Sequence, residues 1–130
     1  MPKLIHTMIR VTDLARSTAF YGKALGLVES HRLEFPTFTL LYLREPESGF
    51  EIELTLNHGQ SEPYTHGSGY GHLAFCVDDL EEHRARMQGA GYVAGEIKEL
   101  PAPATGARFY FITDPDGYKI EVLERAGHYV

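Results

Sequence analysis

The sequence predicts an α+β protein in which one βαβββ module occurs twice. Strands are indicated by alternating apolar and polar side chains. A helical apolar stripe follows the first strand of the first half. The two halves of the chain also resemble each other in order and spacing. With 130 residues, the chain is long enough to bury a core. We therefore expect two curled, mixed sheets, one in residues 1–65 and one in residues 66–130.

The internal repeat places chemically similar residues over each other. When the segment Ile5–Gly26 is laid over Gly71–Gly91, His6 falls on His72. Later in each half, "EPESGFEIEL" resembles "DPDGYKIEV", which places Glu53 over Glu121. A small difference in loop length separates these two matches.

The first half begins with a predicted strand at Ile5–Val11. Thr12 or Asp13 is suited to cap the following helix, and Gly26 is suited to end it. Three further strands are predicted at 28–34, 38–44 and 50–57.

The second half follows the same order. Its first strand is predicted at His72–Val77, and Asp79 is suited to cap the helix. Its later strands are predicted at 93–100, 108–113 and 118–124, and proline and glycine indicate loops at 58–71 and 101–107.

Composition excludes several classes of protein. The net charge is −6 and no Lys/Arg stripe is present, so we expect no nucleic-acid partner. Cys76 is the only cysteine, which excludes an intrachain disulfide and a multi-cysteine metal site. No run approaches the roughly 20 apolar residues of a membrane span, and the first residues do not read as a signal peptide. These features predict a cytoplasmic protein with no membrane partner.

In each of four predicted strands, alternation places one histidine or one glutamate on the polar face. His6 shares a face with Met8 and Arg10, and Glu53 shares one with Asn57. The repeat relates His6 to His72 and Glu53 to Glu121. If the sheets curl, these side chains face a common concavity.

Two imidazoles and two carboxylates form a donor set suited to nickel, zinc, cobalt or iron. Six-coordinate geometry would leave two positions open, which is typical of a catalytic metal. The alternative is that each of these side chains is simply solvated. The recurrence of the same residue type at equivalent positions supports a metal site held by His6, Glu53, His72 and Glu121, and on the pattern alone both alternatives stay open.

Four segments resemble glyoxalase I (lactoylglutathione lyase), in the vicinal oxygen chelate superfamily. They are "HTMIRVTDLARSTAFYGKALGL", "IELTLNHG", "YGHLAFCVDD" and "DPDGYKIEVLE". The resemblance implies paired βαβββ modules and a homodimer with its active sites at the subunit interface. It implies that His6 and Glu53 of one chain bind a divalent metal together with His72 and Glu121 of the other. The short chain with histidine at position 6 is similar to the bacterial nickel class, with cobalt or zinc as alternatives.

The resemblance also implies substrate contacts. Arg10 and Asn57 match positions that hold the γ-glutamyl group of glutathione. The family often carries a basic residue near the position of Ala107, and here Arg108 lies beside it. Arg108 is therefore a candidate contact for the glycine carboxylate.

The implied reaction converts the methylglyoxal–glutathione hemithioacetal into S-lactoylglutathione, through an enediolate held by the metal. Glu121 is expected to be the main base, with Glu53 serving the other stereoisomer. Leu123 and Phe111 would form a dry pocket for the methyl group or belong to the core.

Other functions remain open at this point. The first is another enzyme of the same superfamily, an epimerase or a dioxygenase, although dioxygenases use two histidines and one carboxylate. The second is a binding protein that holds a metal or a small ligand without turnover.

Overall fold

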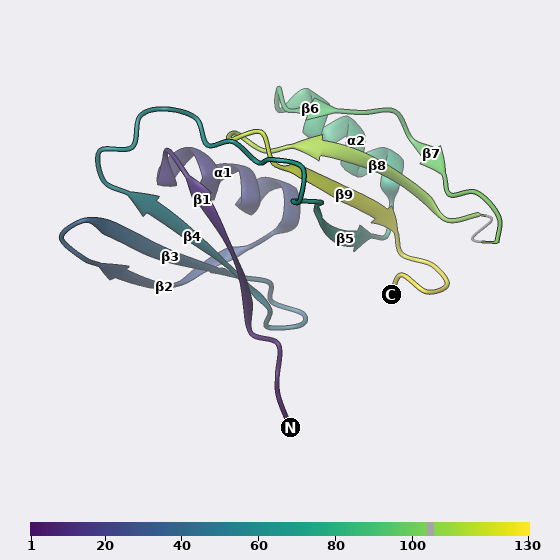
Figure 1. Cartoon of the computed structure of the whole chain (residues 1–130). Coiled ribbons are helices and arrows are strands. Elements are labelled where there is room, and N and C mark those ends of the chain that lie inside the picture. Colours follow the sequence, from purple (N-terminus) through teal and green to yellow (C-terminus); the bar gives the residue numbers. More distant parts are fainter. Residues whose placement is uncertain (104–105) are drawn as a thin grey trace. The chain divides into compact units, whose positions relative to one another are not determined.

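The computed structural model describes residues 1–103 and 106–130. The chain divides into two compact units, Met1–Thr65 and His66–Val130, and each combines one helix with one mixed sheet (Figure 1). The predicted α+β class with two mixed sheets is therefore confirmed. The loop expected at 101–107 is described except for positions 104 and 105, which lie outside the described residues.

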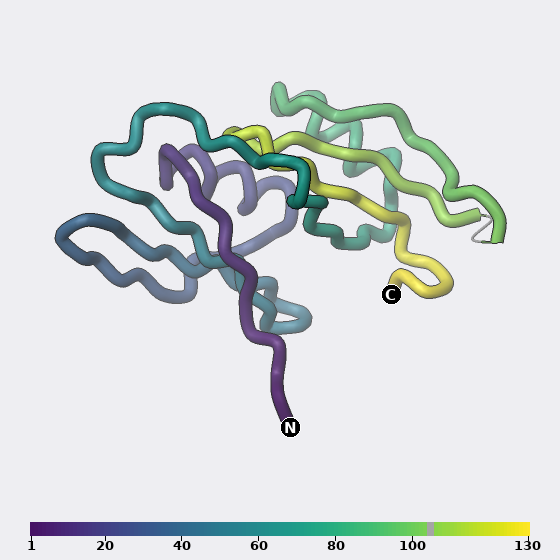
Figure 2. Tube along the Cα trace, viewed as in Figure 1, coloured from purple at the N-terminus to yellow at the C-terminus, as the bar shows by residue number. Residues whose placement is uncertain are grey.

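The first unit has the element order β, α, β, β, β. Its sheet has the order β1-β4-β3-β2, in which β1 runs parallel to β4 and the other pairs are antiparallel. The chain can be followed through these elements from the purple end in Figure 2. The elements are β1 (His6–Val11), α1 (Leu14–Leu25), β2 (Val28–Glu34), β3 (Phe38–Arg44) and β4 (Glu51–Asn57).

Helix α1 begins and ends where the sequence predicts. The Asp13 carboxylate accepts a hydrogen bond from the Arg16 backbone N–H at 2.9 Å, which satisfies a donor of the first turn. Gly26 ends the helix with φ 68°, a conformation that glycine adopts without strain. Between these ends, Phe20 and Tyr21 are fully buried. Each such side chain contributes roughly 1.5–3 kcal/mol through burial.

The second unit repeats the arrangement with shorter outer strands. The sheet order is β5-β9-β8-β6, with β7 also paired to β8, and β5 runs parallel to β9. The elements are β5 (Leu73–Val77), α2 (Leu80–Gly89), β6 (Val93–Ala94), β7 (Lys98–Glu99), β8 (Arg108–Thr113) and β9 (Lys119–Glu124). The Asp79 carboxylate caps α2 by accepting from the Glu82 backbone N–H at 2.9 Å.

The single strand expected at 93–100 is instead two short strands, β6 and β7. Gly95 lies between them, and its N–H still donates to the Phe111 carbonyl at 2.8 Å. The Gly95 carbonyl accepts from Arg84 Nε of helix α2 at 2.6 Å. A side chain of the helix thus contacts the backbone where β6 ends.

The turn before β9 fixes where that strand starts. Asp114 is buried, and its Oδ1 accepts from the backbone N–H groups of Asp116 and Tyr118, both at 2.9 Å. Gly117 has φ 88°, which the turn requires and which side-chain-bearing residues rarely adopt. This turn sets the phase of the strand that carries Glu121.

Neither helix in the described part of the chain has the length and apolar character needed to cross a bilayer.

Candidate metal centre

The first unit brings His6 and Glu53 together on neighbouring strands. In the parallel β1–β4 pair, Met8 lies opposite Glu53, so His6 is two residues away on the same face. His6 Nε2 lies 3.4 Å from Glu53 Oε2. The His6 side chain is 32% exposed and the Glu53 side chain is 13% exposed. The imidazole therefore reaches solvent while the carboxylate is mostly covered.

The second unit brings His72 and Glu121 together in the same way. Ala74 lies opposite Glu121 in the parallel β5–β9 pair, and His72 immediately precedes β5. His72 Nε2 lies 3.8 Å from Glu121 Oε1, and the side chains are 40% and 16% exposed. One histidine thus lies near one glutamate in each unit.

The opposite face of each sheet is apolar. Leu54 follows Glu53, Val122 follows Glu121, and both side chains are fully buried. Alternation along the strands therefore puts each carboxylate on the face away from the core, as the sequence indicates.

The donor atoms of both pairs suit a divalent metal. Imidazole nitrogen and carboxylate oxygen bind such ions at about 2.0–2.2 Å, which places two neighbouring donors roughly 3–3.5 Å apart. The observed separations of 3.4 and 3.8 Å are close to that range. Across residues 1–103 and 106–130, no group of three or more His, Cys, Asp or Glu side chains is arranged to hold an ion. Each unit thus brings together one imidazole and one carboxylate.

Tyr42 is a member of the first site that the sequence did not single out. It lies on β3 opposite Glu53. Its interaction with the Glu53 carboxylate, together with burial and the nearby charges of Glu53 and Glu51, raises the pKa of Tyr42 to about 12. The Tyr42 ring also stands edge-on to His6, with centroids 5.7 Å apart.

Phe111 holds the corresponding place in the second unit. It lies on β8 opposite Glu121, and its ring stands edge-on to His72 at 5.2 Å. The aromatic contact to the histidine is thus repeated, but the ring has no hydroxyl. Leu123, two residues along from Glu121 on the same face, is buried.

Glu51 shares the face of Glu53 and is neutralised locally. Arg44 Nη2 lies 3.4 Å from its carboxylate, and the Ser30 hydroxyl donates to it. Ser30 sits where the β2–β3 register shifts, which turns its side chain toward Glu51. No pattern in the sequence indicates this cluster, because the cluster depends on that irregularity.

The two proposed glutathione contacts in the first unit lie on the ligand-bearing face. Asn57 is four residues from Glu53 on β4, and its Nδ2 donates to the Tyr64 hydroxyl at 3.1 Å. Arg10 lies on β1 opposite Thr55, and its side chain is exposed. Both are therefore placed where a ligand on this face would meet them.

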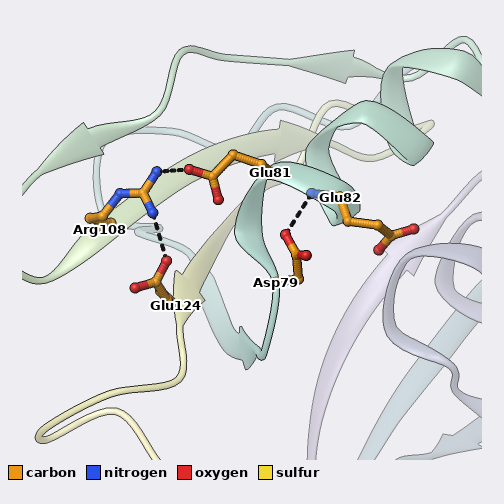
Figure 3. A network of polar contacts seen from close by, with 5 residues as sticks. All are labelled: Asp79, Glu81, Glu82, Arg108 and Glu124. Atoms are coloured by element: carbon orange, nitrogen blue, oxygen red, sulfur yellow. Dashed lines mark hydrogen bonds and ion pairs between the residues drawn. The ribbon is translucent and has the colours of Figure 1, made fainter.

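Arg108 lies on the other face of its sheet. Tyr110 and Ile112 share its face and are fully buried, whereas Phe111 shares the face of Glu121. Figure 3 shows the Arg108 guanidinium between Glu81 of α2 and Glu124 of β9, with Nη1 2.7 Å from Glu124 Oε2. The hydrogen bond from Arg108 lowers the pKa of Glu81. The structure thus gives Arg108 two carboxylate partners away from the His72–Glu121 pair.

Comparison with known proteins identifies relatives of the whole chain. The profile of the Glyoxalase/Bleomycin resistance protein/Dioxygenase superfamily matches residues 3–122. A lactoylglutathione lyase of Haemophilus influenzae is 40% identical over 128 residues, covering 94% of this chain and 92% of the relative.

Solved structures agree with the fold. The trypanothione-dependent glyoxalase I of Leishmania major is 36% identical, with a TM-score of 0.76 over 95% of this chain and 87% of that one. Glyoxalase I of Zea mays has a TM-score of 0.84 at 28% identity over 96% of this chain. This chain spans 45% of the maize protein. The resemblance to glyoxalase I inferred from the sequence is confirmed, and the chain belongs to the Glyoxalase/Bleomycin resistance protein/Dioxygenase superfamily.

Proposed function

We propose that the chain is a metal-dependent lactoylglutathione lyase. It would convert the hemithioacetal of methylglyoxal and glutathione into S-lactoylglutathione and so remove methylglyoxal. The observation that carries the proposal is the pair of equivalent histidine–glutamate sites, at 3.4 and 3.8 Å. It is supported by 40% identity to the lactoylglutathione lyase of Haemophilus influenzae over most of both chains.

The metal ligands in this proposal are His6, Glu53, His72 and Glu121, with nickel as the expected ion and cobalt or zinc as substitutes. A bound divalent ion supplies Lewis-acid stabilisation of the negative charge that develops on the substrate oxygens during isomerisation. The chain's own contribution is a set of donors whose carboxylates are largely covered and therefore need a cationic partner.

A homodimer would complete the ligand set, because each unit carries two donors. One chain would contribute His6 and Glu53, and its partner would contribute His72 and Glu121. This arrangement has a direct test. Glu53→Gln and Glu121→Gln subunits, each inactive alone, should regain activity when unfolded together and refolded. One of the two sites in each mixed dimer would then carry four native ligands. No recovery beyond that of the separate variants would contradict the shared site.

Glu121 is proposed as the base. The isomerisation moves a proton from the carbon that bears sulfur to the adjacent carbonyl carbon. The oxygen on the carbon that bears sulfur loses its hydroxyl proton and becomes the thioester carbonyl. The oxygen on the adjacent carbon gains a proton and becomes a hydroxyl, so the atoms balance. A carboxylate placed beside both carbons can take the first proton and return it, a contribution of about 10²–10⁴-fold. Glu53 would act on the other stereoisomer of the hemithioacetal.

Substrate binding is proposed for Arg10 and Asn57, which lie on the ligand face and suit the charged γ-glutamyl group. Arg108 was also expected to contact substrate. Its place on the opposite face, between Glu81 and Glu124, does not support that role. The cytoplasmic location expected from the sequence stays a prediction.

A metal-titrated assay tests the function. The protein is freed of metal and supplied with nickel, cobalt or zinc, and thioester absorbance is followed with methylglyoxal and either glutathione or trypanothione. We expect turnover only with metal and fastest with nickel and glutathione. Faster turnover with trypanothione would show that trypanothione, and not glutathione, is the preferred thiol of the substrate. Tight metal binding without thioester formation by either thiol would contradict the proposed enzyme and favour a binding protein or another superfamily reaction.

A further inference from the structure

The loop after strand β4 returns one tyrosine to the residue at which the strand ends. Asn57 is the last residue of β4 and shares the face of Glu53. Its Nδ2 donates to the Tyr64 hydroxyl at 3.1 Å, and both side chains are half-buried. One of the two amide branches of Asn57 therefore has a fixed partner within the first unit.

Hydrogen bonds within the loop fix the path of the chain between these two residues. The Gln60 N–H donates to the Asn57 carbonyl at 3.2 Å, which closes a turn through Gly59 at φ 83°. Gln60 Nε2 then donates to the Glu62 carbonyl at 2.8 Å, two residues before Tyr64. The chain itself thus places the tyrosine beside the end of β4.

The contact determines what Asn57 offers to a ligand. An amide carries its donor Nδ2 and its acceptor Oδ1 on two branches of one plane. Because Nδ2 is directed at Tyr64, Oδ1 is directed away from it, and an oxygen acceptor suits a cationic ammonium group. The γ-glutamyl arm of glutathione carries an ammonium group beside a carboxylate, and a guanidinium such as that of Arg10 suits only the carboxylate.

The equivalent position in the second unit is engaged differently. The match that lays Glu53 over Glu121 lays Asn57 over Arg125. Arg125 Nε lies 3.1 Å from Asp78 Oδ1. The amide–hydroxyl pair is therefore particular to the first unit and is not a product of the repeated fold.

A buried hydroxyl on the same face is an independent observation. Thr55 lies between Glu53 and Asn57 in the alternation of β4 and is 8% exposed. Its Oγ1 is buried and has no hydrogen-bond partner among the residues that the structure describes. An unsatisfied buried hydroxyl costs stability, and in a native protein it calls for an explanation. A polar ligand bound at this end of the face supplies one.

We propose that Tyr64 is a positioning residue that orients the Asn57 amide so that Oδ1 accepts from the ammonium group of the γ-glutamyl arm. This inference rests on the proposed function, which assigns Asn57 to that arm. Without the Tyr64 hydroxyl, the amide can rotate about its terminal torsion and turn its own N–H groups toward the ammonium group. Tyr64 thus acts through Asn57, on binding of the substrate and not on proton transfer.

The test compares two probes that differ by the ammonium group alone. The first is S-methylglutathione. The second is its glutaryl analogue, which keeps the terminal carboxylate but lacks the ammonium group. Calorimetric titration of the nickel-loaded protein measures both dissociation constants for the parent, for Tyr64→Phe and for Tyr129→Phe. The last variant is the matched control for loss of a tyrosine hydroxyl, in the C-terminal segment.

Tyr64→Phe should bind S-methylglutathione about fivefold more weakly, as expected for loss of one hydrogen bond, and should bind the glutaryl analogue like the parent. In turnover, KM should rise by a similar factor while kcat stays close to the parent value. Tyr129→Phe should match the parent throughout. Equal weakening for both probes would reduce Tyr64 to a structural part of the loop and overturn the inference, as would parent-like binding of S-methylglutathione.

An Asn57→Ala background shows whether Tyr64 acts through Asn57. There, Tyr64→Phe should change the dissociation constant of S-methylglutathione by less than about twofold, because the amide that it orients is gone. A full fivefold loss in this background would mean that Tyr64 acts independently of Asn57, contrary to the proposal. Melting temperatures of all variants confirm that they fold.

A measurement on the parent keeps the inference testable if Tyr64→Phe does not fold. Nuclear magnetic resonance follows proton exchange of the side-chain amides in the metal-free, isotope-labelled protein. One Asn57 amide proton should exchange about tenfold more slowly than those of Gln88, an exposed residue of α2. Equal exchange would show that the Asn57 amide is not held, and the proposal would be wrong.

The parent protein also separates this inference from the proposed function. A parent that forms no thioester and does not bind S-methylglutathione refutes the proposed function itself. A parent that does both, with a Tyr64→Phe variant that behaves like it, refutes only the role of Tyr64.

Discussion

His6 and Glu53 lie 3.4 Å apart, Nε2 to Oε2, although β2 and β3 separate their strands in the sequence. They meet because β1 pairs in parallel with β4, in a register that puts both residues on one face. His72 and Glu121 meet through the equivalent β5–β9 pair. The predictions below examine what these two pairs and their surroundings do.

Glu121→Gln should lower kcat by about 10²–10⁴-fold while the protein remains folded, because the amide keeps the shape but accepts no proton at the working pH. Stopped-flow measurement of thioester absorbance with saturating metal checks this. Glu99→Gln, an exposed change on β7, is the matched control and should leave turnover unaltered. Turnover of the Glu121 variant at the parent rate would refute the assignment of the base.

Removal of the metal by a chelator should abolish turnover, and nickel should restore it more fully than zinc. The ligands proposed here are imidazole and carboxylate groups, and the affinity of such a site depends on their deprotonated forms. Activity after dialysis and after stepwise addition of each ion is the measurement. Full activity in a sample shown by elemental analysis to lack metal would exclude the metal-dependent mechanism.

Arg10→Ala should raise KM for the glutathione adduct about tenfold with a smaller effect on kcat. The reason is the loss of a hydrogen bond to a charged group, worth roughly 1.5–3 kcal/mol. Steady-state kinetics at fixed nickel concentration checks the prediction, and Lys3→Ala near the N-terminus serves as the charge-matched control. The role of Arg10 would be wrong if both variants gave the parent KM.

Arg108→Met should lower the melting temperature at pH 7 and leave KM unchanged, because Arg108 joins Glu81 to Glu124 on the helix-facing side of the sheet. The pKa of Glu81 is lowered in the folded protein, so its stabilising contribution is present above the ordinary glutamate pKa. That contribution is lost as the pH falls through the lowered value. The difference in melting temperature should therefore shrink in strongly acidic buffer. A raised KM would instead revive Arg108 as a substrate contact.

Tyr110→Phe should destabilise the fold by about 1 kcal/mol, because a buried hydrogen bond to His83 Nδ1 is lost. Burial raises the pKa of Tyr110 to about 12, so the hydroxyl is protonated at neutral pH and can donate. Urea unfolding measures the change. Turnover should be retained, since Tyr110 faces the core; loss of turnover at unchanged stability would place this residue in the reaction instead.

The two histidine–glutamate pairs were accessible to sequence analysis for a physical reason. Alternation along a strand assigns each residue to a face without any tertiary information. The internal repeat then selects His6 and Glu53 from the other polar residues by matching them to His72 and Glu121. Strand alternation and the internal repeat are both periodic patterns, so they can be recognised in a single sequence.

Arg108 and Tyr42 show where such reasoning ends. The face of Arg108 depends on the register of β8, and the preceding loop of prolines and glycines carries no alternation from which to count. Tyr42 is an aromatic residue in an apolar strand and looks like any core side chain. Only the antiparallel pairing of β3 with β4 reveals that it lies opposite Glu53. Likewise, β6 ends beside Gly95, whose carbonyl accepts a hydrogen bond from Arg84 that no local pattern encodes.

The parallel pairing of β1 with β4 has a consequence for how the protein matures. The antiparallel β3–β4 pair is a local structure that can form early, while β1 must be added across the intervening helix and hairpin, a slower non-local event. Glu53 is therefore held in its strand by a local hairpin, whereas its approach to the His6 imidazole depends on the non-local β1–β4 pairing. A substitution that weakens only the β1–β4 pairing would separate these two side chains and leave the β3–β4 hairpin able to form.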